Sequence, residues 1–266
     1  YSDETIENYR SGNKYRYPDV DYYSSEYLRE FRPVTRLNAE FSGGNRTIQY
    51  YTDLGWTNTG SLYKLGTGKD ARTDELNLRA NANVKINDFI QSTLDATANF
   101  VFDKSPNAGF TIEGSSIPGD FWDAAATYHP NYYSPLLPVS MLDEATKASL
   151  PLSTKYIDGQ YLLGGTTQYK DNVYGNMFRA GYTQNIGRLM GITQGLEFDL
   201  NSITEGLTFK TLVGIDLFNS FVQGVTNTYA VYQPTWATTD GVDQIVGLKT
   251  INKDEASGVQ DVETAF

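Results

Sequence analysis

The chain has 266 residues, and its 21 Lys and Arg against 32 Asp and Glu give a formal net charge of −11. Such an acidic chain repels phosphate backbones, which excludes nucleic acid as a partner. The absence of Cys excludes disulfide scaffolds and thiolate metal sites, and a single His excludes multi-histidine zinc sites. Aromatic residues make up 14%, which argues against disorder, and no stretch approaches the roughly 20 apolar residues of a transmembrane helix.

The first 34 residues are polar and rich in Tyr, with Pro18 and Pro33 as breakers. We expect a short helix within 22–32 and no hydrophobic core in this segment. The chain opens without Met or a signal peptide and stops in the middle of its pattern. We therefore expect it to be a piece of a larger protein.

Strict alternation of apolar and polar residues begins at Thr35. In the clearest run, Leu76 and Leu78 alternate with Asn77 and Arg79. An α-helix would instead need apolar residues at positions i, i+3, i+4 and i+7, which these runs lack. The sequence therefore predicts about six β-strands, at 35–42, 48–56, 75–85, 91–103, 190–200 and 207–217.

The connections between these strands differ in length. Short turns are predicted at 43–46, 86–88 and 202–206, and long connections at 57–71 and 104–187. The strands reach the ~9–11 residues that cross a bilayer, and short turns alternate with long loops in transmembrane barrels. We therefore expect an all-β fold, a transmembrane antiparallel β-barrel, with residues after 217 loop-like. Because the smallest such barrels have about eight strands, the rest of its own protein would have to complete it.

Several stretches, taken in order, resemble the SusC/RagA family of TonB-dependent outer-membrane transporters of Bacteroidota. They are YPDVDYY at 17–23, FSGGN at 41–45 leading into YYTDLG at 50–55, NANVKINDFIQSTLD at 81–95, and FDL at 198–200 with ITEGLTF at 203–209.

The resemblance implies a 22-stranded barrel with an N-terminal plug. Residues 1–34 would be the barrel-entry segment that follows the plug, which is not in this chain. Residues 35–266 would be the N-terminal part of the barrel, with a long extracellular loop at about 104–187. The plug and the TonB box have no counterpart here, so no residue is assigned to energy coupling.

The implied function is nutrient import across the outer membrane. The substrate would be an oligosaccharide or a peptide, and the barrel would sit in outer-membrane lipid. A SusD-like surface lipoprotein would act as a lid, and the TonB–ExbB–ExbD complex would supply energy through parts outside this chain. The resemblance does not specify the substrate.

Aromatic residues in the long loop are the best candidates for contacts with substrate or lid, because aromatic faces stack on sugar faces and on peptide side chains. The alternative is that they only pack the loop against itself or against a lid. Phe41, Trp56 and Phe102 lie in strands and are expected to be interfacial aromatics. The candidate loop contacts are Trp122, Tyr128, Tyr132, Tyr133, Tyr156 and Tyr161.

Residues with catalytic or metal-binding side chains lack the constellations that chemistry needs. His129 has no nucleophile motif beside it, and Asp240–Asp243 lacks the spacing of a calcium-binding EF-hand. The strand carboxylates are expected to face the barrel lumen instead of forming a glycosidase pair. We expect no enzyme activity, no cofactor and no metal. The carboxylates concerned are Asp95, Asp103, Glu197 and Asp199.

Two further functions remain as alternatives. A soluble β-rich carbohydrate-binding module would suit the acidity and the Tyr content, and a β-rich glycosidase fragment rests only on the carboxylates. The direction of the apolar face discriminates between them and an importer, because a soluble sandwich turns that face inward whereas a membrane barrel turns it toward lipid.

Overall fold

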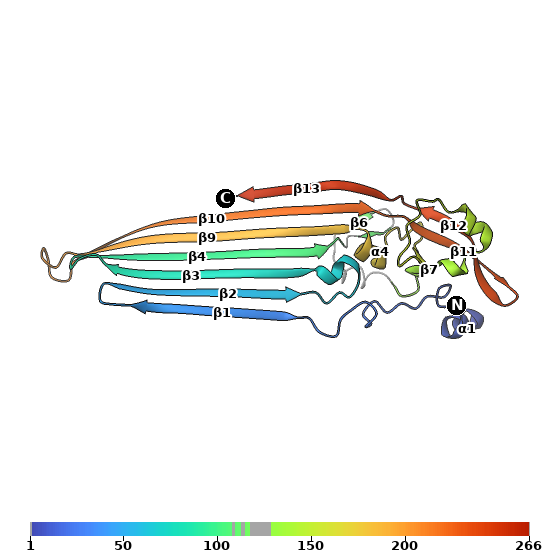
Figure 1. Cartoon of the computed structure of the whole chain (residues 1–266), viewed down its shortest axis with the longest axis horizontal. Helices are drawn as coiled ribbons and strands as arrows, with labels where there is room; N and C mark the ends of the chain where they lie inside the picture. Colours follow the sequence, from blue (N-terminus) through green and yellow to red (C-terminus); the bar gives the residue numbers. More distant parts are fainter. Residues whose placement is uncertain (1, 108–109, 113–114, 118–128, 266) are drawn as a thin grey trace.

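A computed structural model describes residues 2–107, 110–112, 115–117 and 129–265. Seven long antiparallel strands form one open sheet in the order β1-β2-β3-β4-β9-β10-β13 (Figure 1). This architecture confirms the prediction of an antiparallel all-β fold. The strands are β1 (Val34–Gly44), β2 (Ile48–Gly60), β3 (Arg72–Lys85), β4 (Ile90–Pro106), β9 (Gly181–Asp199), β10 (Thr208–Thr228) and β13 (Glu255–Ala265).

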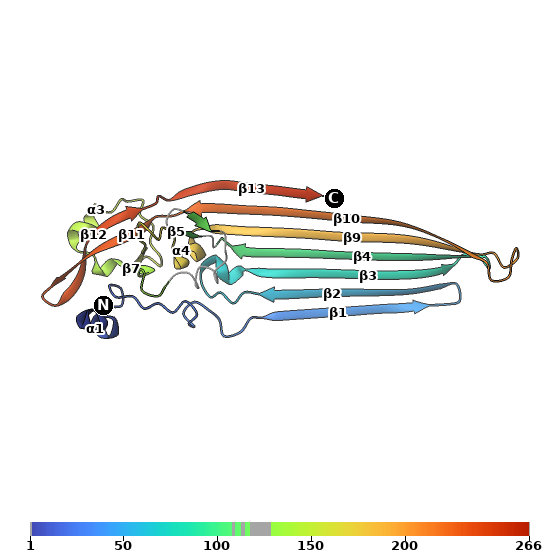
Figure 2. The ribbon, with the colours of Figure 1, turned by 180° about the vertical axis from the view of Figure 1, so that it is seen from behind.

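The other elements gather at one end of the sheet, where they form a compact body that we call the cap (Figure 2). None of the described helices is long and apolar enough to span a membrane. The cap contains α1 (Asp3–Ser11), η1 (Gly66–Asp70), β5 (Phe110–Ile112), β6 (Ser115–Ile117), β7 (Leu136–Pro138), η2 (Val139–Met141), α3 (Glu144–Ser149), β8 (Tyr161–Leu163), α4 (Val173–Phe178), β11 (Val231–Thr239) and β12 (Val242–Ile251).

Three short turns close the opposite end, at 45–47, 86–89 and 200–207, as the sequence predicts. Asparagine side chains hold two of them. The Oδ1 atom of Asn45 accepts hydrogen bonds from the backbone N–H groups of Thr47 (2.7 Å) and Ile48 (3.0 Å). The Oδ1 atom of Asn87 does the same for Phe89 (2.8 Å) and Ile90 (2.9 Å). Asn favours turns because it can bond its own backbone in this way.

The strand register joins the alternating runs into two continuous faces, because residues that pair directly across an antiparallel ladder lie on the same side of the sheet. Leu78 of β3 pairs with Leu54 of β2 and Ala98 of β4, so these three share one side. Arg79 pairs with Asp53 on the other side. We call the first side the apolar face and the second the polar face.

The C-terminal part of the chain differs from the expectation of loop structure after residue 217. Strand β10 continues to Thr228, β11 and β12 form a hairpin, and β13 adds a seventh strand by pairing with β10. The hairpin turn is Asp240-Gly241, with φ angles of 53° and 80°, which suits a two-residue turn between strands. The Asp-Gly dipeptide was thus a hairpin signal in a segment where apolar alternation is weak.

The N-terminal segment also differs from expectation. The helix expected within 22–32 is absent, because that segment forms turns and a single bridge between Leu28 and Tyr63. The helix lies instead at Asp3–Ser11, where the side chain of Ser2 caps its first turn. Tyr22 and Tyr27 are 4% exposed, so this segment does contribute to a core.

The hydrophobic core lies in the cap and not in the sheet. Every described hydrophobic side chain that is buried belongs to a residue outside the seven sheet strands. Both predicted long connections contribute to this core. The longer one spans 107–180 and not 104–187, because β4 and β9 extend into its predicted ends. The buried hydrophobic residues are Tyr22, Tyr27, Tyr133, Leu137, Leu142, Ile157, Leu162, Leu163, Val173, Tyr174, Met177, Ala180, Tyr229, Val231, Tyr232, Ile245 and Ile251.

A buried polar network around Asn172 ties distant parts of the cap together. The side chain of Asn172 is fully buried and its Nδ2 donates to the carbonyl oxygens of Pro135 and Gly164, both at 2.7 Å. Its Oδ1 accepts from the backbone N–H of Gly175 at 2.9 Å, which caps α4. The hydroxyl of Tyr229 lies 2.9 Å from the backbone nitrogen of Asn172 and 2.6 Å from Oδ1 of Asn176. Four chain segments thus meet around Asn172.

We predict that Asn172→Ala destabilises the cap by about 3 kcal/mol, since each buried carbonyl left without a donor costs roughly 1–3 kcal/mol. The measurement is the unfolding of the cap in increasing denaturant, with protease resistance as the readout of the folded fraction. Asn131→Ala, at an exposed position, is the matched control and should change little. Equal stability of the two variants would show that the network does not hold the cap.

Candidate functional site

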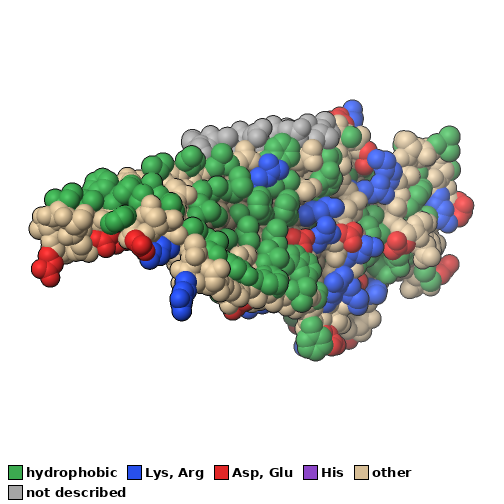
Figure 3. All heavy atoms as spheres, turned by 60° about the vertical axis from the view of Figure 1, so that its left-hand side comes forward, with side chains coloured by type: hydrophobic (Ala, Val, Ile, Leu, Met, Phe, Trp, Pro, Cys, Tyr) green, Lys and Arg blue, Asp and Glu red, His purple; other side chains and the backbone are tan. Residues whose placement is uncertain are grey.

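The apolar face of the sheet is uncovered in the structure. Ile215 is 70% exposed, Leu37 61% and Ile192 55%, although all three sit well inside their strands. Figure 3 shows the hydrophobic side chains as one continuous surface. Apolar patches of this extent on a protein surface mark a site of contact with a protein or a membrane.

The three strand aromatics predicted to be interfacial lie on this apolar face. Phe41 pairs with Thr52, toward the turns. Trp56 pairs with Leu76, and Phe102 pairs with Asp74, both toward the cap. Taken over both strands, the apolar rows run from that of Val84 in β3 to that of Phe102 in β4, or about 33 Å along the strands at ~3.3 Å per residue. With the ~40° tilt of barrel strands, this length gives a band of about 25 Å, which matches a transmembrane barrel.

The polar face carries rows of side chains that bond across the strands. Nδ2 of Asn99 donates to Oδ1 of Asn77 at 2.5 Å, and Asn81 donates to Asp95. Lys210 Nζ and Glu197 Oε2 form an ion pair of 2.9 Å. The four carboxylates singled out in the sequence, Asp95, Asp103, Glu197 and Asp199, all lie on this face by register.

A cavity of about 460 Å³ opens in the cap between the N-terminal segment and the long loop. Its walls combine tyrosines with carboxylates, and one cation, Lys14, lies among them. Tyrosine faces can stack on sugars or on peptide side chains, and carboxylates accept hydrogen bonds from hydroxyl or amino groups. The tyrosines are Tyr15, Tyr27, Tyr161 and Tyr174, and the carboxylates are Asp19, Asp21, Glu26 and Asp158.

Tyr15, Tyr27 and Tyr174, three of the tyrosines around this cavity, have raised pKa values. Burial raises the pKa of Tyr27, and the neighbouring Tyr22 and Glu26 raise it further. Burial is also the main cause that raises the pKa of Tyr174, followed by the charge of Asp158. The same combination of burial, Tyr161 and Glu26 raises the pKa of Tyr15. These hydroxyls are therefore neutral hydrogen-bond donors at physiological pH.

The structure separates the aromatic residues that the sequence singled out. Tyr161 lines the cap cavity. Tyr132 stacks on Tyr169 with ring centroids 4.4 Å apart, and Tyr133 is 7% exposed, its hydroxyl donating to the carbonyl oxygen of Asp171 at 3.1 Å. Tyr156 is 37% exposed, and its carbonyl oxygen accepts from Arg179. Tyr133 is therefore a core residue. Trp122 and Tyr128 lie outside the described residues.

Sequence reasoning missed the partners of Tyr161. Tyr15 and Tyr27 come from the segment expected to lack a core, and the rings of Tyr27 and Tyr174 pack in a T-shape with their centroids 5.8 Å apart. The only signal in the sequence was the density of Tyr within residues 9–27. Backbone contact between the two segments, from Val20 N–H to the Pro130 carbonyl oxygen at 3.2 Å, cannot be read from local pattern.

The remaining candidates, His129 and the segment Asp240–Asp243, make contacts that serve the fold. His129 is exposed, and its ring lies 4.8 Å from that of Tyr132. In the segment Asp240–Asp243, the first residue forms the hairpin turn, and Asp243 is paired with Arg16 at 2.5 Å. Among the described residues, no three His, Cys, Asp or Glu side chains are grouped as a metal site would need.

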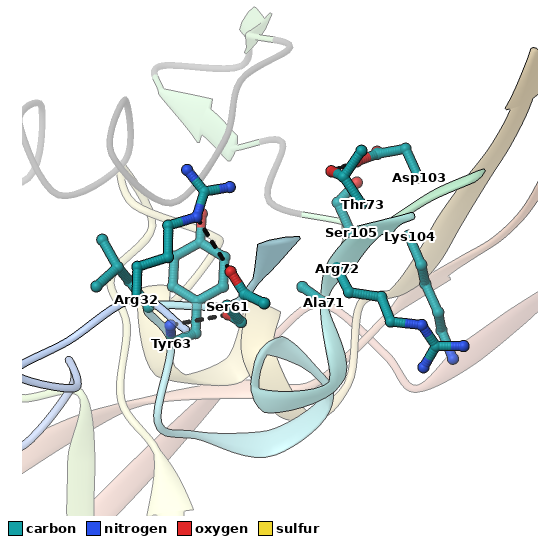
Figure 4. A pocket seen from close by; sticks show the side chains of 11 residues that line it. Arg32, Ser61, Tyr63, Ala71, Arg72, Thr73, Asp103, Lys104 and Ser105 are labelled. Carbon is teal, nitrogen blue, oxygen red and sulfur yellow. Dashed lines mark hydrogen bonds between the residues drawn. The ribbon is translucent and has the colours of Figure 1, made fainter. Parts of the chain in front are cut away.

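Another cavity, of about 430 Å³, lies where the sheet meets the cap (Figure 4). Arg32, Arg72 and Lys104 line it together with Asp103. The side chains of Arg72 and Lys104 extend to one side of the sheet, whereas those of Thr73 and Asp103 extend to the other, where Thr73 Oγ1 donates to Asp103 Oδ1 at 2.7 Å.

Comparisons with known proteins bear on the fold. No protein-family model and no curated protein matches the chain. Among solved structures, the chain is similar to the RagAB peptide importer in its closed-closed state, with a TM-score of 0.50 and 17% identity. The match covers 78% of this chain and 20% of that one, so this chain spans about a fifth of its length. At this identity the likeness shows the fold alone, an antiparallel sheet of the type found in a β-barrel transporter.

We predict that the cap loosens as the pH rises above about 10. A free Tyr loses its proton near that pH, whereas buried Tyr27 retains it to higher pH, so the unfolded chain then binds fewer protons and stability falls. Protease resistance of the cap at about pH 8 and pH 11 measures the effect. Tyr27→Phe should lessen the alkaline loss, and Tyr23→Phe, at a 53% exposed position, should not. Identical alkaline loss in both variants would rule out the buried hydroxyl as its cause.

Proposed function

We propose that the chain is part of a TonB-dependent outer-membrane importer of the SusC type, which takes up oligosaccharides or peptides beneath a SusD-like lipoprotein lid. The observation that carries this proposal is the continuous, uncovered apolar face of the sheet opposite a hydrogen-bonded polar face. In a barrel, the first face meets lipid and the second lines a watery lumen. The likeness to the RagAB peptide importer supports the same architecture.

The unequal connections support the orientation of this barrel. The short turns at 45–47, 86–89 and 200–207 lie at one end, and the cap lies at the other (Figure 1). Outer-membrane barrels have short periplasmic turns and long extracellular loops. On this proposal the cap faces the cell exterior, where a surface lipoprotein would cover it, and TonB acts from the periplasm through parts outside this chain.

The soluble alternative finds less support in the geometry. A carbohydrate-binding sandwich covers the apolar side of one sheet with that of a second sheet. Here the buried hydrophobic residues lie in the cap, and the large hydrophobic residues on the apolar face, such as Ile215, stand open to their surroundings. At about 25 cal/mol per Å², leaving such a surface in water is costly, whereas lipid removes that cost.

The mechanism that we propose is capture followed by passage. The cap cavity, with Tyr161 and Asp158 in its wall, would hold part of the substrate between cap and lid. The polar face would then offer successive hydrogen-bonding rows along the lumen, such as the one formed by Asn77 and Asn99. No bond of the substrate breaks in this process, so the proposal includes no catalytic residue and no enzyme activity.

We predict that Leu78→Arg impairs barrel assembly far more than Asn81→Arg. Leu78 lies near the middle of the apolar face, where an Arg facing lipid costs about 2–4 kcal/mol. Asn81 lies on the polar face beside Asp95, where an added cation meets water and a carboxylate. The measurement is the yield of heat-modifiable, detergent-extracted barrel. Similar yields from the two variants would contradict the assignment of the faces.

We predict that Tyr161→Ala lowers substrate uptake roughly tenfold, because loss of one aromatic contact in a cavity removes about 1–1.5 kcal/mol of binding. The measurement is uptake of labelled oligosaccharide or peptide by cells that carry the assembled transporter. Leu152→Ala serves as the control, since Leu152 is fully exposed and does not line the cavity. Unchanged uptake in the Tyr161 variant, with normal barrel assembly, would remove the cavity from the transport path.

A further inference from the structure

The apolar face of the sheet carries almost as many cations as the polar face. In the strands β1–β4, β9 and β10, there are seven Lys and Arg residues. By register, Arg72, Lys104 and Arg188 lie on the apolar face, because Arg72 pairs with Lys104 and Arg188 pairs with Phe100. The four on the polar face are Arg36, Arg79, Lys85 and Lys210.

Two of the three cations on the apolar face, Arg72 and Lys104, lie at its border with the cap. Arg72 begins β3, and the row that contains it continues through Lys104 to Gln184 without an apolar side chain. The adjacent row, toward the turns, contains Phe102 and Ile186. Arg188 lies one row further, and a long side chain there can reach the border while its methylene groups stay in apolar surroundings. Figure 3 shows Lys and Arg side chains gathered along this side of the hydrophobic surface.

These cations keep much of their charge free for a ligand. Arg72 Nε bonds Asp74 Oδ2 at 2.9 Å, yet its side chain is 57% exposed and its other N–H groups stay available. Lys104 Nζ lies 5.2 Å from the ring centre of Tyr182. Among the described residues, neither Lys104 nor Arg188 has an ion pair, and Asp103 extends to the opposite side of the sheet (Figure 4).

We propose that Arg72, Lys104 and Arg188 bind the phosphate groups of a phosphorylated lipid in the leaflet on the cap side of the membrane. The inference rests on the proposed function, because it needs the apolar face to lie in a bilayer. Guanidinium groups bind phosphate through paired hydrogen bonds. Tyr182 lies beside Lys104 at the height where aromatic rings occupy the membrane–water interface. The occupant is a lipid and not a free anion, because the basic row continues directly into the apolar face that would hold its acyl chains.

The test is native mass spectrometry of the detergent-extracted transporter titrated with diphosphorylated lipid A. The variant Arg72→Gln, Lys104→Gln, Arg188→Gln should bind it about a hundredfold more weakly, since each basic residue near an anionic bilayer surface contributes roughly a factor of five. The matched control is Arg36→Gln, Arg79→Gln, Lys210→Gln, which removes the same charges from the polar face. It should bind like the unmodified protein. Lys104→Arg, which keeps the charge, should also bind normally.

Four results would overturn the proposal. The first three are equal loss in both triple variants, unchanged binding in the apolar-face variant, and equally tight binding of lipid A from which the phosphates have been removed. The fourth is displacement of the lipid by millimolar inorganic phosphate, which would assign the row to a free anion. A chain that stays in buffer without detergent would refute the proposed function itself, whereas a detergent-dependent barrel without phosphate-dependent lipid binding would refute only this inference.

Discussion

Direct pairing across the antiparallel ladder is the constraint on which the rest of the structure depends. Each strand alternates between apolar and polar residues, but only the register aligns those residues from strand to strand. Phe41, Thr52 and Ala80 fall in one row, and the row continues through β4 and β9 to Ile215. A slip of one residue at any pair would send every side chain of that strand to the wrong face. The side-chain oxygens of Asn45 and Asn87 fix the turns and so help to set the register.

The sheet and the cap use the hydrophobic effect in different ways. The cap buries its apolar side chains against one another and satisfies its buried polar groups through the network around Asn172, as a water-soluble domain does. The sheet holds its strands together by backbone hydrogen bonds and leaves side chains such as Leu37 and Ile215 largely exposed. In lipid, the backbone groups of such a sheet must be hydrogen-bonded and its outward side chains must be apolar. Both conditions are met along β3, which pairs with a strand on each side and carries only apolar outward side chains from Leu76 to Val84.

This division explains which parts could be predicted from the sequence. Alternation is a local signal, so runs such as Leu76 to Val84 predict their strands and faces directly. Strand β13 lacks a comparable apolar run, so the sequence pattern does not identify it although it pairs with β10. The cap depends on contacts between distant segments, and no local period brings Tyr27 to Tyr174. The candidate site was therefore located only in part: Tyr161 lines the cavity, whereas Tyr133 belongs to the core.

Under the function that we propose, each part of the molecule lies in a different environment. The apolar face would meet lipid, the border of Arg72 and Lys104 would meet headgroups, the polar face would meet water, and the cap would meet substrate and lid. These assignments all require that one face of the sheet lies in a bilayer. They would fail together if that face were covered by protein.

A nitroxide scan along β3 tests this requirement most directly. Single Cys residues placed from Leu76 to Val84 can be labelled without interference, because the chain has no Cys of its own. In the reconstituted protein, we expect collisions with lipid-soluble oxygen to peak at Leu76, Leu78, Ala80, Ala82 and Val84, and collisions with a water-soluble nickel complex to peak at the positions between them. Oxygen accessibility without this period of two, or with its maxima at Asn77, Arg79 and Asn81, would contradict a lipid-facing apolar surface.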